Sequence, residues 1–421
     1  MPMLEEYNCI VSDEVDPIEC DLGSIVLTKD SIFIGWGVGE GRPDYEKRPS
    51  QVKLVGRCEL KGGEVDGDRL IMGEPELHHA IDILLQRAPN IAYLCVSGAG
   101  PFRLLGKRYR DDTRTSSNYG QIISSTTQPR WSKHSLYTSA LNGVSKSKFG
   151  RKASEVTVLV ALDVNTAALG EHYYMLDQSF DGTELEYQLT RALRTTAYVK
   201  ISNSVNVGFI SNGWMNRGRG HSQMSVFRPR KSRRINGQVI IDRFEGICKR
   251  HGDCIEGLVC IDALSKRLLK SGYSVPASGA SIKDLYEATG TIEAPVWLWS
   301  AFYVSQLIQV TTAMVSPLRV SLGGVLATGP DQKYDAGWSE FIDLIKLYFE
   351  AELWSDVSNE NPISPSPYFR EVIQPDFISY RSCAYPSVLG GLIAARWDKT
   401  NYYPSPVQYM FEQQKRNVIP T

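Results

Sequence analysis

Short runs of apolar residues, each ended by Gly, Asp or Asn, recur along the chain. β-Branched and aromatic residues fill four of these runs, at Ser31–Trp36, Asn90–Val96, Val156–Leu162 and Val239–Ile241. Such runs predict β-strands. Helical stretches lie between them, among them Glu76–Gln86 and Thr183–Leu193. An alternation of strands and helices predicts mixed sheets flanked by helices, which defines the α/β class.

Two later segments are predicted to form long helices. Trp338–Leu353 repeats apolar residues at steps of three and four, the pattern of a helix with one buried face. Ala294–Leu318 carries no charge and is long enough to cross a bilayer. It also contains two glutamines and two threonines, whose burial in lipid would be costly. We therefore expect this segment to be a helix in the core of a large α/β domain.

The composition is that of a soluble globular protein large enough for two domains. The chain has 421 residues and a net charge of -1, with 42% hydrophobic and 22% charged residues. This composition excludes a fibre or a disordered tail. This charge gives no overall reason for a polyanionic partner. Its eight unevenly spaced cysteines predict reduced thiols, and the acidic first 21 residues do not resemble a signal peptide. We expect a cytoplasmic protein that has no membrane partner.

The segment Cys248–Cys254 holds the clearest candidate chemistry. It reads Cys-x-x-His-x-x-Cys, so Cys248, His251 and Cys254 offer two thiolates and an imidazole within seven residues. These are the donors that Zn²⁺ prefers, and a short loop brings them to a common centre at little cost in chain entropy. The other interpretation is a set of ordinary thiols beside a loop histidine.

A basic segment covers residues 217–234. No carboxylate lies between Met215 and Gly237, and the cations are Arg217, Arg219, Arg228, Arg230, Lys231, Arg233 and Arg234. Three interpretations remain open: a solvated loop, a site for an anion or phosphorylated ligand, or a surface for nucleic acid or an acidic partner. Nucleic acid is the less favoured, because Phe227 is the one aromatic residue among these charges.

Several motifs, in order, resemble those of one family. The loop at 248–258, C-K-R-H-G-D-C-I-E-G-L, is similar to the zinc loop C-P-x-H-G-D-C-L-E-G-L of the fructokinase branch of the ROK sugar kinases. D-V-N-T-A-A-L-G-E at 163–171 resembles that family's D-V-N-A-A-A-L-G-E. Further similarities lie at 98–101, 119–131, 316–325 and 389–395. The resemblance therefore covers most of the chain.

The resemblance implies a fold, a reaction and partners. The fold would be the actin-like ATPase (RNase H-like) fold, with two α/β lobes around a central cleft. We expect an N-terminal lobe at 1–160, a C-terminal lobe at 161–400 that carries the zinc-type loop 248–254, and a C-terminal segment at 401–421. The reaction would be phosphorylation of a hexose, fructose in this branch, by ATP with Mg²⁺. The partners would be a small sugar and a second copy in a homodimer.

Asp163 is the candidate catalytic base. It follows the apolar run Val156–Leu162 and precedes what reads as a helix start, so its carboxylate would lie at the end of a strand. The resemblance implies that it takes the proton from the sugar hydroxyl. An aspartate that caps the helix, with no catalytic role, would have the same position. The resemblance also implies that Asn165 and Glu256 lie near the sugar.

The predicted phosphate loops depart from the family. A G-G-T hairpin is represented either by Asp21–Ile25, which contains Gly23 and Ser24, or by Gly23–Lys29, and both ranges lack the second glycine. A run G-T-G-I-G-G-G appears as residues 203–209, with Gly208 as its one glycine. The third loop, L-G-G-G-V, is reduced to a pair, Gly323 and Gly324. Side chains at such positions block the close approach of phosphate to backbone that glycine permits. These five residues are the candidate, degenerate nucleotide-binding residues.

The sugar and zinc sites depart as well. Where the family has H-P-E-M-G-H-I, this chain has H-S-Q-M-S-V-F, so Gln223 replaces a sugar-binding glutamate and Val226 replaces the fourth zinc ligand. A weakened zinc site and a metal-free loop are both consistent with this change. Two hypotheses follow: an ATP-dependent hexose kinase, or a kinase-fold protein that no longer transfers phosphate and binds a sugar, an anion or a protein partner.

Overall fold

A computed structural model of the chain describes most of its residues. The described ranges are 4–12, 14–29, 31–39, 52–62, 64–65, 68–69, 72–103, 119–123, 129–131, 133–149, 152–179, 194–216, 223–235, 238–275, 282–324, 336–350, 373 and 376–399. The helix predicted at Thr183–Leu193, the start of the basic segment at 217–222 and the C-terminal segment 401–421 lie outside the described residues.

The chain folds into two compact units, each built from separated stretches of sequence. Unit 1 contains Met1–Thr196, Gly208–His221 and Ser382–Thr421, and unit 2 contains Ala197–Val207 and Ser222–Arg381. The two-unit α/β organisation is the one expected. The expected lobes were continuous stretches of sequence with boundaries at residues 160 and 400. These boundaries remain predictions.

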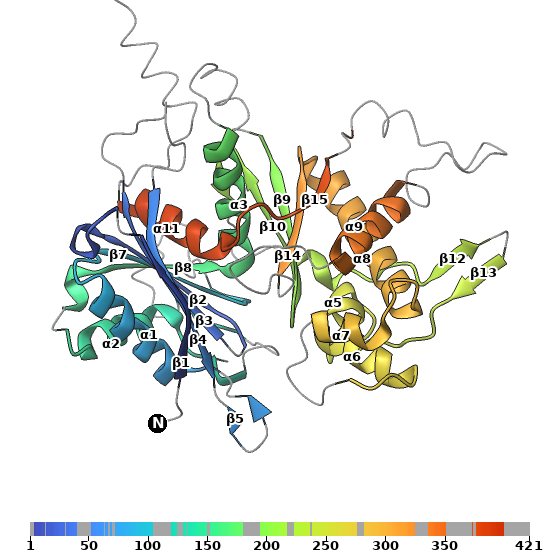
Figure 1. The fold of residues 1–421 in the computed structure, drawn as a ribbon, viewed down its shortest axis with the longest axis horizontal. Helices are drawn as coiled ribbons and strands as arrows, with labels where there is room; N and C mark the ends of the chain where they lie inside the picture. Colours follow the sequence, from blue (N-terminus) through green and yellow to red (C-terminus); the bar gives the residue numbers. More distant parts are fainter. Residues whose placement is uncertain are drawn as a thin grey trace, which may run out of the picture. The chain divides into compact units, whose positions relative to one another are not determined.

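A six-stranded sheet forms the centre of unit 1 (Figure 1). Its order is β1 (Leu4–Val11), β4 (Val52–Gly62), β3 (Ser31–Gly39), β2 (Leu22–Leu27), β7 (Tyr93–Gly98) and β8 (Thr157–Leu162). The pairs from β1 to β2 are antiparallel, and β7 and β8 then run parallel to β2. The strands predicted from the apolar runs at residues 31, 90 and 156 are therefore confirmed. A two-stranded ribbon, β5 (Glu64–Val65) and β6 (Asp68–Arg69), is separate from this sheet.

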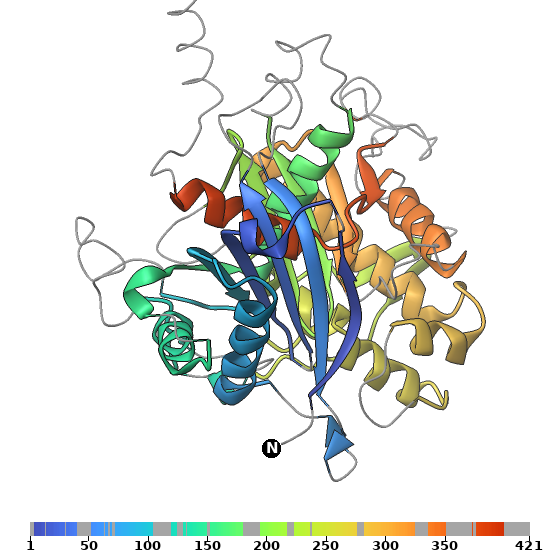
Figure 2. The ribbon, with the colours of Figure 1, turned by 60° about the vertical axis from the view of Figure 1, so that its left-hand side comes forward.

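Helices cover both faces of this sheet, as Figures 1 and 2 show. One face contacts α1 (Glu74–Arg87) and α2 (Leu136–Lys146), and the other contacts α3 (Asp163–Ser179) and α11 (Pro386–Lys399). Every residue of β2 is therefore buried, which explains why this strand reads as a nearly continuous apolar run. The helix predicted at Glu76–Gln86 is confirmed as α1.

A second sheet has the order β11 (Trp214–Met215), β10 (Val205–Ser211), β9 (Thr196–Ile201), β14 (Val320–Gly324) and β15 (Ile378–Tyr380). The division between the two units falls within β10, between Val207 and Gly208. In unit 2, β14 pairs in parallel with both β9 and β15. Short 3-10 turns lie at Pro17–Glu19, Pro129–Trp131, Ala153–Glu155 and Met224–Val226.

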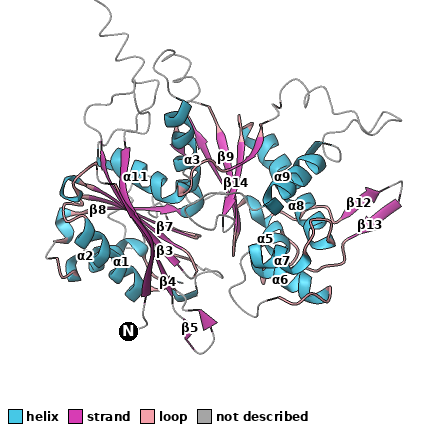
Figure 3. Cartoon of the chain, in the orientation of Figure 1, coloured by secondary structure: helices cyan, strands magenta, loops and turns pink. Residues whose placement is uncertain are grey.

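The helices of unit 2 are α5 (Ile255–Val259), α6 (Ile261–Lys270), α7 (Ile282–Thr289), α8 (Pro295–Val315) and α9 (Ala336–Tyr348), drawn in cyan in Figure 3. The hairpin β12 (Ser232–Ile235) and β13 (Gln238–Ile241) belongs to the same unit. The strand predicted at residues 239–241 is confirmed as β13. The helix predicted at Trp338–Leu353 is confirmed through Tyr348, in α9.

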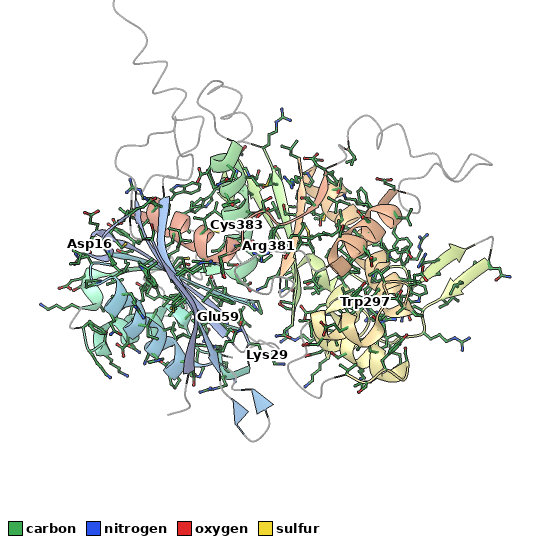
Figure 4. All side chains as sticks on the ribbon, viewed as in Figure 1. Asp16, Lys29, Glu59, Trp297, Arg381 and Cys383 are labelled. Carbon is green, nitrogen blue, oxygen red and sulfur yellow. The ribbon has the colours of Figure 1, made fainter. Side chains whose placement is uncertain are left out.

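The charge-free segment at 294–318 forms α8, which is largely buried in unit 2. Its polar side chains are satisfied there, since the Thr311 and Thr312 hydroxyls donate to the carbonyls four residues back, each at 2.8 Å. Trp297, labelled in Figure 4, packs edge-on against Phe341 of α9. The expected buried helix is confirmed. Within the described residues, no helix is long and apolar enough to span a bilayer.

Candidate functional site

Asp163 is the first residue of α3, directly after β8. Its side chain is 5% exposed, and Oδ1 accepts a hydrogen bond of 2.8 Å from the Val164 amide. Asn165, one residue further, is buried as well, and its Nδ2 lies 3.4 Å from the Asn216 carbonyl oxygen. The strand-to-helix junction predicted for Asp163 is confirmed. It holds a carboxylate and an amide in the first turn of one helix.

Gly208 packs directly against this turn. A Cβ atom at position 208 would meet the Val164 carbonyl oxygen at 2.3 Å and the Asn165 amide nitrogen at 3.1 Å. Backbone at that distance cannot be moved aside cheaply, so glycine is required for β10 to approach α3. The packing of unit 1 thus explains the one glycine that the run at 203–209 retains.

Glu171 ties α3 to the segment that leads into α11. Its two carboxylate oxygens accept the amides of Ser382 (2.5 Å) and Cys383 (2.8 Å), the latter labelled in Figure 4. At the other end of the helix, the Ser387 hydroxyl donates to the Asp163 carbonyl at 3.1 Å. The last residue of the motif at 163–171 therefore has a positioning role that sequence reasoning missed.

Gly23 and Ser24 lie inside β2 rather than in the hairpin turn expected near them. A Cβ at Gly23 would meet Leu84 of α1 at 2.9 Å, and Ser24 is fully buried. The register aligns Gly23 with Leu94 of β7, so it lies about five positions, roughly 16 Å, from the level of Asp163. The structure does not bring Gly23 and Ser24 together with Asp163.

β2 ends at Leu27 and β3 begins at Ser31, so the connection between them comes later, and its sequence contains no glycine. Leu27, Gly98 and Leu162 lie side by side in β2, β7 and β8, so Thr28 and Asp163 follow at the same end of the sheet. The Thr28 amide and hydroxyl both donate to the Ser31 carbonyl at 2.9 Å. The length of the apolar run could have located this turn, because it continues to Leu27.

The turn between β9 and β10 satisfies its own amides. The Ser202 amide donates to the Ser204 carbonyl (2.9 Å), and the Ser204 amide donates to Ser202 Oγ (3.4 Å). The Val207 amide in turn donates to Asn206 Oδ1 (2.9 Å). The amides of Ser202, Ser204 and Val207 are therefore engaged within this segment, while the Val205 amide donates to the Glu256 carboxylate. These four amides do not need a bound anion to accept their hydrogen bonds.

Gly323 and Gly324 end β14, and each is closely packed. A Cβ at Gly323 would meet Tyr198 Oη at 2.0 Å, and one at Gly324 would meet the Ile201 carbonyl oxygen at 2.0 Å. Gly324 also has φ +131, a conformation that favours glycine. The contact of β14 with β9 thus requires both residues to be glycine.

The loop 248–254 gathers its three candidate ligands. The donor atoms of Cys248, His251 and Cys254 all lie within 4.8 Å of one another, and Cys248 Sγ is 3.6 Å from His251 Nδ1. A thiolate and an imidazole on one tetrahedral zinc are roughly 3.5 Å apart, so the three atoms fit three corners of such a site. The amides of His251 and Gly257 each point at a ligand sulfur, at 3.4 Å.

Burial determines the protonation state of Cys254. Burial raises the pKa of the Cys254 thiol well above its ordinary value of 9.0, while the Gly257 amide has the smaller, opposite effect. A buried thiol of this kind stays protonated unless a cation is bound beside it. Cys248, His251 and Cys254 together could hold one metal ion.

Two cations of the basic segment hold this loop from outside. Arg228 Nε lies 3.3 Å from Asp253 Oδ1, and its guanidinium donates to the His251 carbonyl through Nε and Nη2 at 3.2 and 3.0 Å. Lys231 Nζ is 3.8 Å from the other oxygen of Asp253. The Ile255 amide donates to the Phe227 carbonyl at 3.0 Å. This part of the basic segment is therefore a structural support for the loop.

Glu256 lies beside the metal-type loop, in the first turn of α5. Burial raises the pKa of its carboxyl group, while a hydrogen bond from the Val205 amide and the charge of Arg250 lower it. Gln223 is exposed and precedes the turn Met224–Val226. Within unit 2, Glu256 lies close to the three candidate metal ligands of the loop 248–254. Within unit 1, Asp163, Asn165 and Gly208 lie close together.

These features define a class of protein: an α/β protein of the actin-like ATPase fold in which one loop brings two cysteines and a histidine together. The ROK family matches residues 77–331, more than half of the chain. The chain belongs to the ROK family.

Known relatives and structures agree with this assignment. A fructokinase from Lactococcus lactis subsp. cremoris is 25% identical over 56% of this chain and 64% of its own length. The chain thus spans a little less than two thirds of this curated relative. A ROK hexokinase from Thermus thermophilus and a ROK protein from Streptococcus pneumoniae, crystallised with sucrose, are each 15% identical with a TM-score of 0.53. Each match covers 90% of this chain. The matches cover 99% of the Thermus thermophilus structure and 100% of the Streptococcus pneumoniae structure, and they show the fold.

Proposed function

We propose that this chain is a sugar-binding ROK protein that has lost ATP-dependent phosphoryl transfer. The observation that carries the proposal is the turn Ser202–Ser204, in which the amides of Ser202 and Ser204 are hydrogen-bonded within the turn. In the family that this loop resembles, glycine-rich backbone wraps the phosphates. A phosphate placed here would have to break those internal bonds and pass two serine side chains.

The turn between β2 and β3 supports the same conclusion. It contains Thr28 and Lys29 where the resemblance implies adjacent glycines, and the Thr28 side chain closes the turn onto Ser31. Residual affinity for phosphate would then rest on side-chain charge and not on converging amides. Two phosphate loops of different strands are altered in the same way.

The residues that the resemblance assigns to the sugar are better preserved. Asp163 and Asn165 are buried and Glu256 is half-buried, and side chains of these types accept and donate hydrogen bonds to sugar hydroxyls. The names of the relatives, a fructokinase and a protein crystallised with sucrose, favour a hexose or a fructose-containing sugar. We propose fructose as the first ligand to test.

We propose zinc as the metal of the loop 248–254. Cys248, His251 and Cys254 would hold it, and Val226 leaves the fourth position to a non-protein ligand. The metal, when bound, supplies the positive charge that keeps the Cys254 thiolate ionised. Residues of the loop would then orient Glu256, two positions further along. None of the eight cysteines forms a disulfide, which supports a cytoplasmic setting.

An ATP- and Mg²⁺-dependent fructokinase is the second candidate. The observation in its favour is the carboxylate of Asp163, which the Val164 amide holds in a defined orientation at the start of α3. A base held in this way could accept the proton of a sugar hydroxyl as that oxygen attacks the γ-phosphate. The altered phosphate turns make it the weaker candidate.

Calorimetry on the purified full chain separates the two candidates. We expect heat from fructose, no heat from ATP·Mg²⁺, no fructose-dependent release of ADP, and zinc in the same preparation. Changing Ser202 and Ser204 to Gly should give detectable nucleotide binding, because the turn can then open. ADP release that disappears in Asp163→Asn would show the kinase instead. Absence of binding of both fructose and nucleotide would contradict both candidates.

A further inference from the structure

The hairpin β12–β13 exposes an apolar strand. Val239, Ile240 and Ile241 are consecutive in β13 and are 60%, 42% and 63% exposed. In Figure 1 the hairpin extends beyond the helices α5 to α9 of its own unit. Three adjacent exposed branched residues on a strand are unusual, because burying their apolar surface would be favourable.

The base of the hairpin is firmly held, so its exposure is not a consequence of a loose attachment. Asp242, which follows β13, is buried and forms an ion pair of 2.8 Å with Arg267, and it accepts the Tyr303 hydroxyl. Arg230, which precedes β12, exchanges two backbone hydrogen bonds with the Gln306 amide group, at 2.8 and 3.1 Å. The hairpin is therefore a fixed feature of unit 2.

The two faces of the hairpin differ. Arg233 of β12 is buried, with its guanidinium 4.1 Å from the centre of the Tyr348 ring and 5.3 Å from that of Phe302. Ile240 is its partner in the register, so it shares this inner face. Val239 and Ile241 lie on the opposite face. The inner face anchors the hairpin, and the outer face leaves two large apolar side chains exposed.

The outer edge of β13 offers backbone groups for pairing. β12 and β13 form a sheet of two strands, so among the described residues no third strand pairs with β13. An exposed apolar strand edge is a template for an added strand, with backbone hydrogen bonds giving affinity and alternate side chains giving specificity.

The charge around the hairpin selects the kind of strand that can be added. Residues 228–250 hold eight Arg and Lys and two acidic residues, although the whole chain has a net charge of -1. Asp242 is neutralised by Arg267, and Arg230, Arg243, Lys249 and Arg250 are exposed. A second copy would bring like charges together, whereas an acidic segment would be attracted.

We propose that the β12–β13 hairpin is the docking site of a protein partner, which adds an extended segment with alternating acidic and apolar residues to the edge of β13. The apolar side chains of that segment would cover Val239 and Ile241. Its carboxylates would lie among the surrounding cations. This role is independent of whether the chain phosphorylates a sugar.

The test uses the full chain and three labelled synthetic peptides, followed by fluorescence anisotropy. The first alternates Glu with Val, the second has Lys in place of each Glu, and the third is the first with every second backbone amide methylated. We expect the Glu peptide to bind about tenfold or more tighter than the Lys peptide. Its affinity should fall as salt is added, because the attraction is screened. Methylation should abolish binding, since it removes the donors that pair with the strand edge.

Two exposed positions provide matched variants. Ile241→Asp should weaken the Glu peptide about tenfold or more, whereas Leu269→Asp, at a 58% exposed site on α6, should leave it unchanged. Both should keep the melting temperature of the parent, because neither side chain is buried. The proposal is overturned if the Glu peptide does not bind, if the Lys or methylated peptide binds equally well, or if Ile241→Asp has no effect. Self-association, or binding of a DNA oligonucleotide, that is lost in Ile241→Asp would also overturn it.

Discussion

Glycines in this chain are retained where backbone is in contact with backbone or a buried ring. Gly208, Gly323 and Gly324 each lie so close to a neighbour that a Cβ would be within 2.3 Å of it. Ser202 and Ser204 lie in a turn where their own amides are hydrogen-bonded internally. Packing therefore explains why glycine stands at positions 208, 323 and 324, and under the proposed function no ligand requires glycine at positions 202 and 204.

Changing Gly208 to Ala should destabilise unit 1, because the new Cβ would collide with the Val164 carbonyl. We expect a loss of about 1–3 kcal/mol in the free energy of unfolding, measured by urea titration. Gly143→Ala is the matched control. Its Cβ would meet the flexible ends of the Ile81 and His78 side chains, and alanine favours the helix α2. Equal stability of the two variants would contradict the packing argument.

Buried ionic and aromatic contacts attach the hairpin β12–β13 to α6, α8 and α9. The side chains of Asp242 and Arg267 are 6% and 8% exposed, and Arg267 also lies over the Phe244 ring, 4.2 Å from its centre. A buried pair of this kind adds little stability relative to apolar residues, but removal of one partner leaves an uncompensated charge. The basic segment therefore contains structural cations, such as Arg233 and Lys231, as well as exposed ones.

Asp242→Asn should cost about 3–5 kcal/mol of stability, because Arg267 then stays buried without a counter-charge. The double variant Asp242→Asn with Arg267→Met should recover much of this loss. Thermal unfolding followed by circular dichroism measures both. If the single and double variants melt at the same temperature, the loss of stability does not come from an uncompensated charge on Arg267.

At the scale of secondary-structure elements, the pattern of apolar residues was enough to predict several elements. These are the strands at residues 31, 90, 156 and 239 and the helices α1, α8 and α9. The sequence left the turn between β2 and β3 open between the ranges Asp21–Ile25 and Gly23–Lys29, and the second reaches the observed end of β2 at Leu27. A strand buried on both faces has no alternation to mark its end. The exposed apolar strand β13 could not be recognised either. Its pattern is that of a buried strand, and exposure depends on contacts made elsewhere in the chain.

At the scale of the whole molecule, unit 1 depends on the C-terminal part of the chain. α11 packs on the sheet formed by the first 162 residues, where Val388 faces Gly35 and Gly391 faces Ser24. Leu392 and Ile393 of the same helix are fully buried. Long-range contacts of this kind mean that the N-terminal sheet cannot complete its core before the end of the chain has been added.

A chain ending at residue 381 should therefore fail to fold unit 1 stably. Exposing the side chains that α11 buries costs about 1.5–3 kcal/mol for each large one, which together approaches the total stability of a domain. We expect loss of the cooperative melting transition and aggregation on gel filtration. A chain ending at residue 400 keeps α11 and is the control. A sharp transition in the shorter chain, at the temperature of the control, would contradict this dependence.

The amino-acid sequence by itself determined the features that depend on neighbouring residues: the alternation of strands and helices, the junction at Asp163, and a loop with three metal ligands within seven residues. The family motifs could be recognised in the sequence for the same reason, because each consists of neighbouring residues. Only the tertiary structure decided which turns are closed by their own hydrogen bonds, which cations are structural, and that β13 is exposed. Each of these depends on contacts between residues far apart in the chain, and no local spacing encodes them.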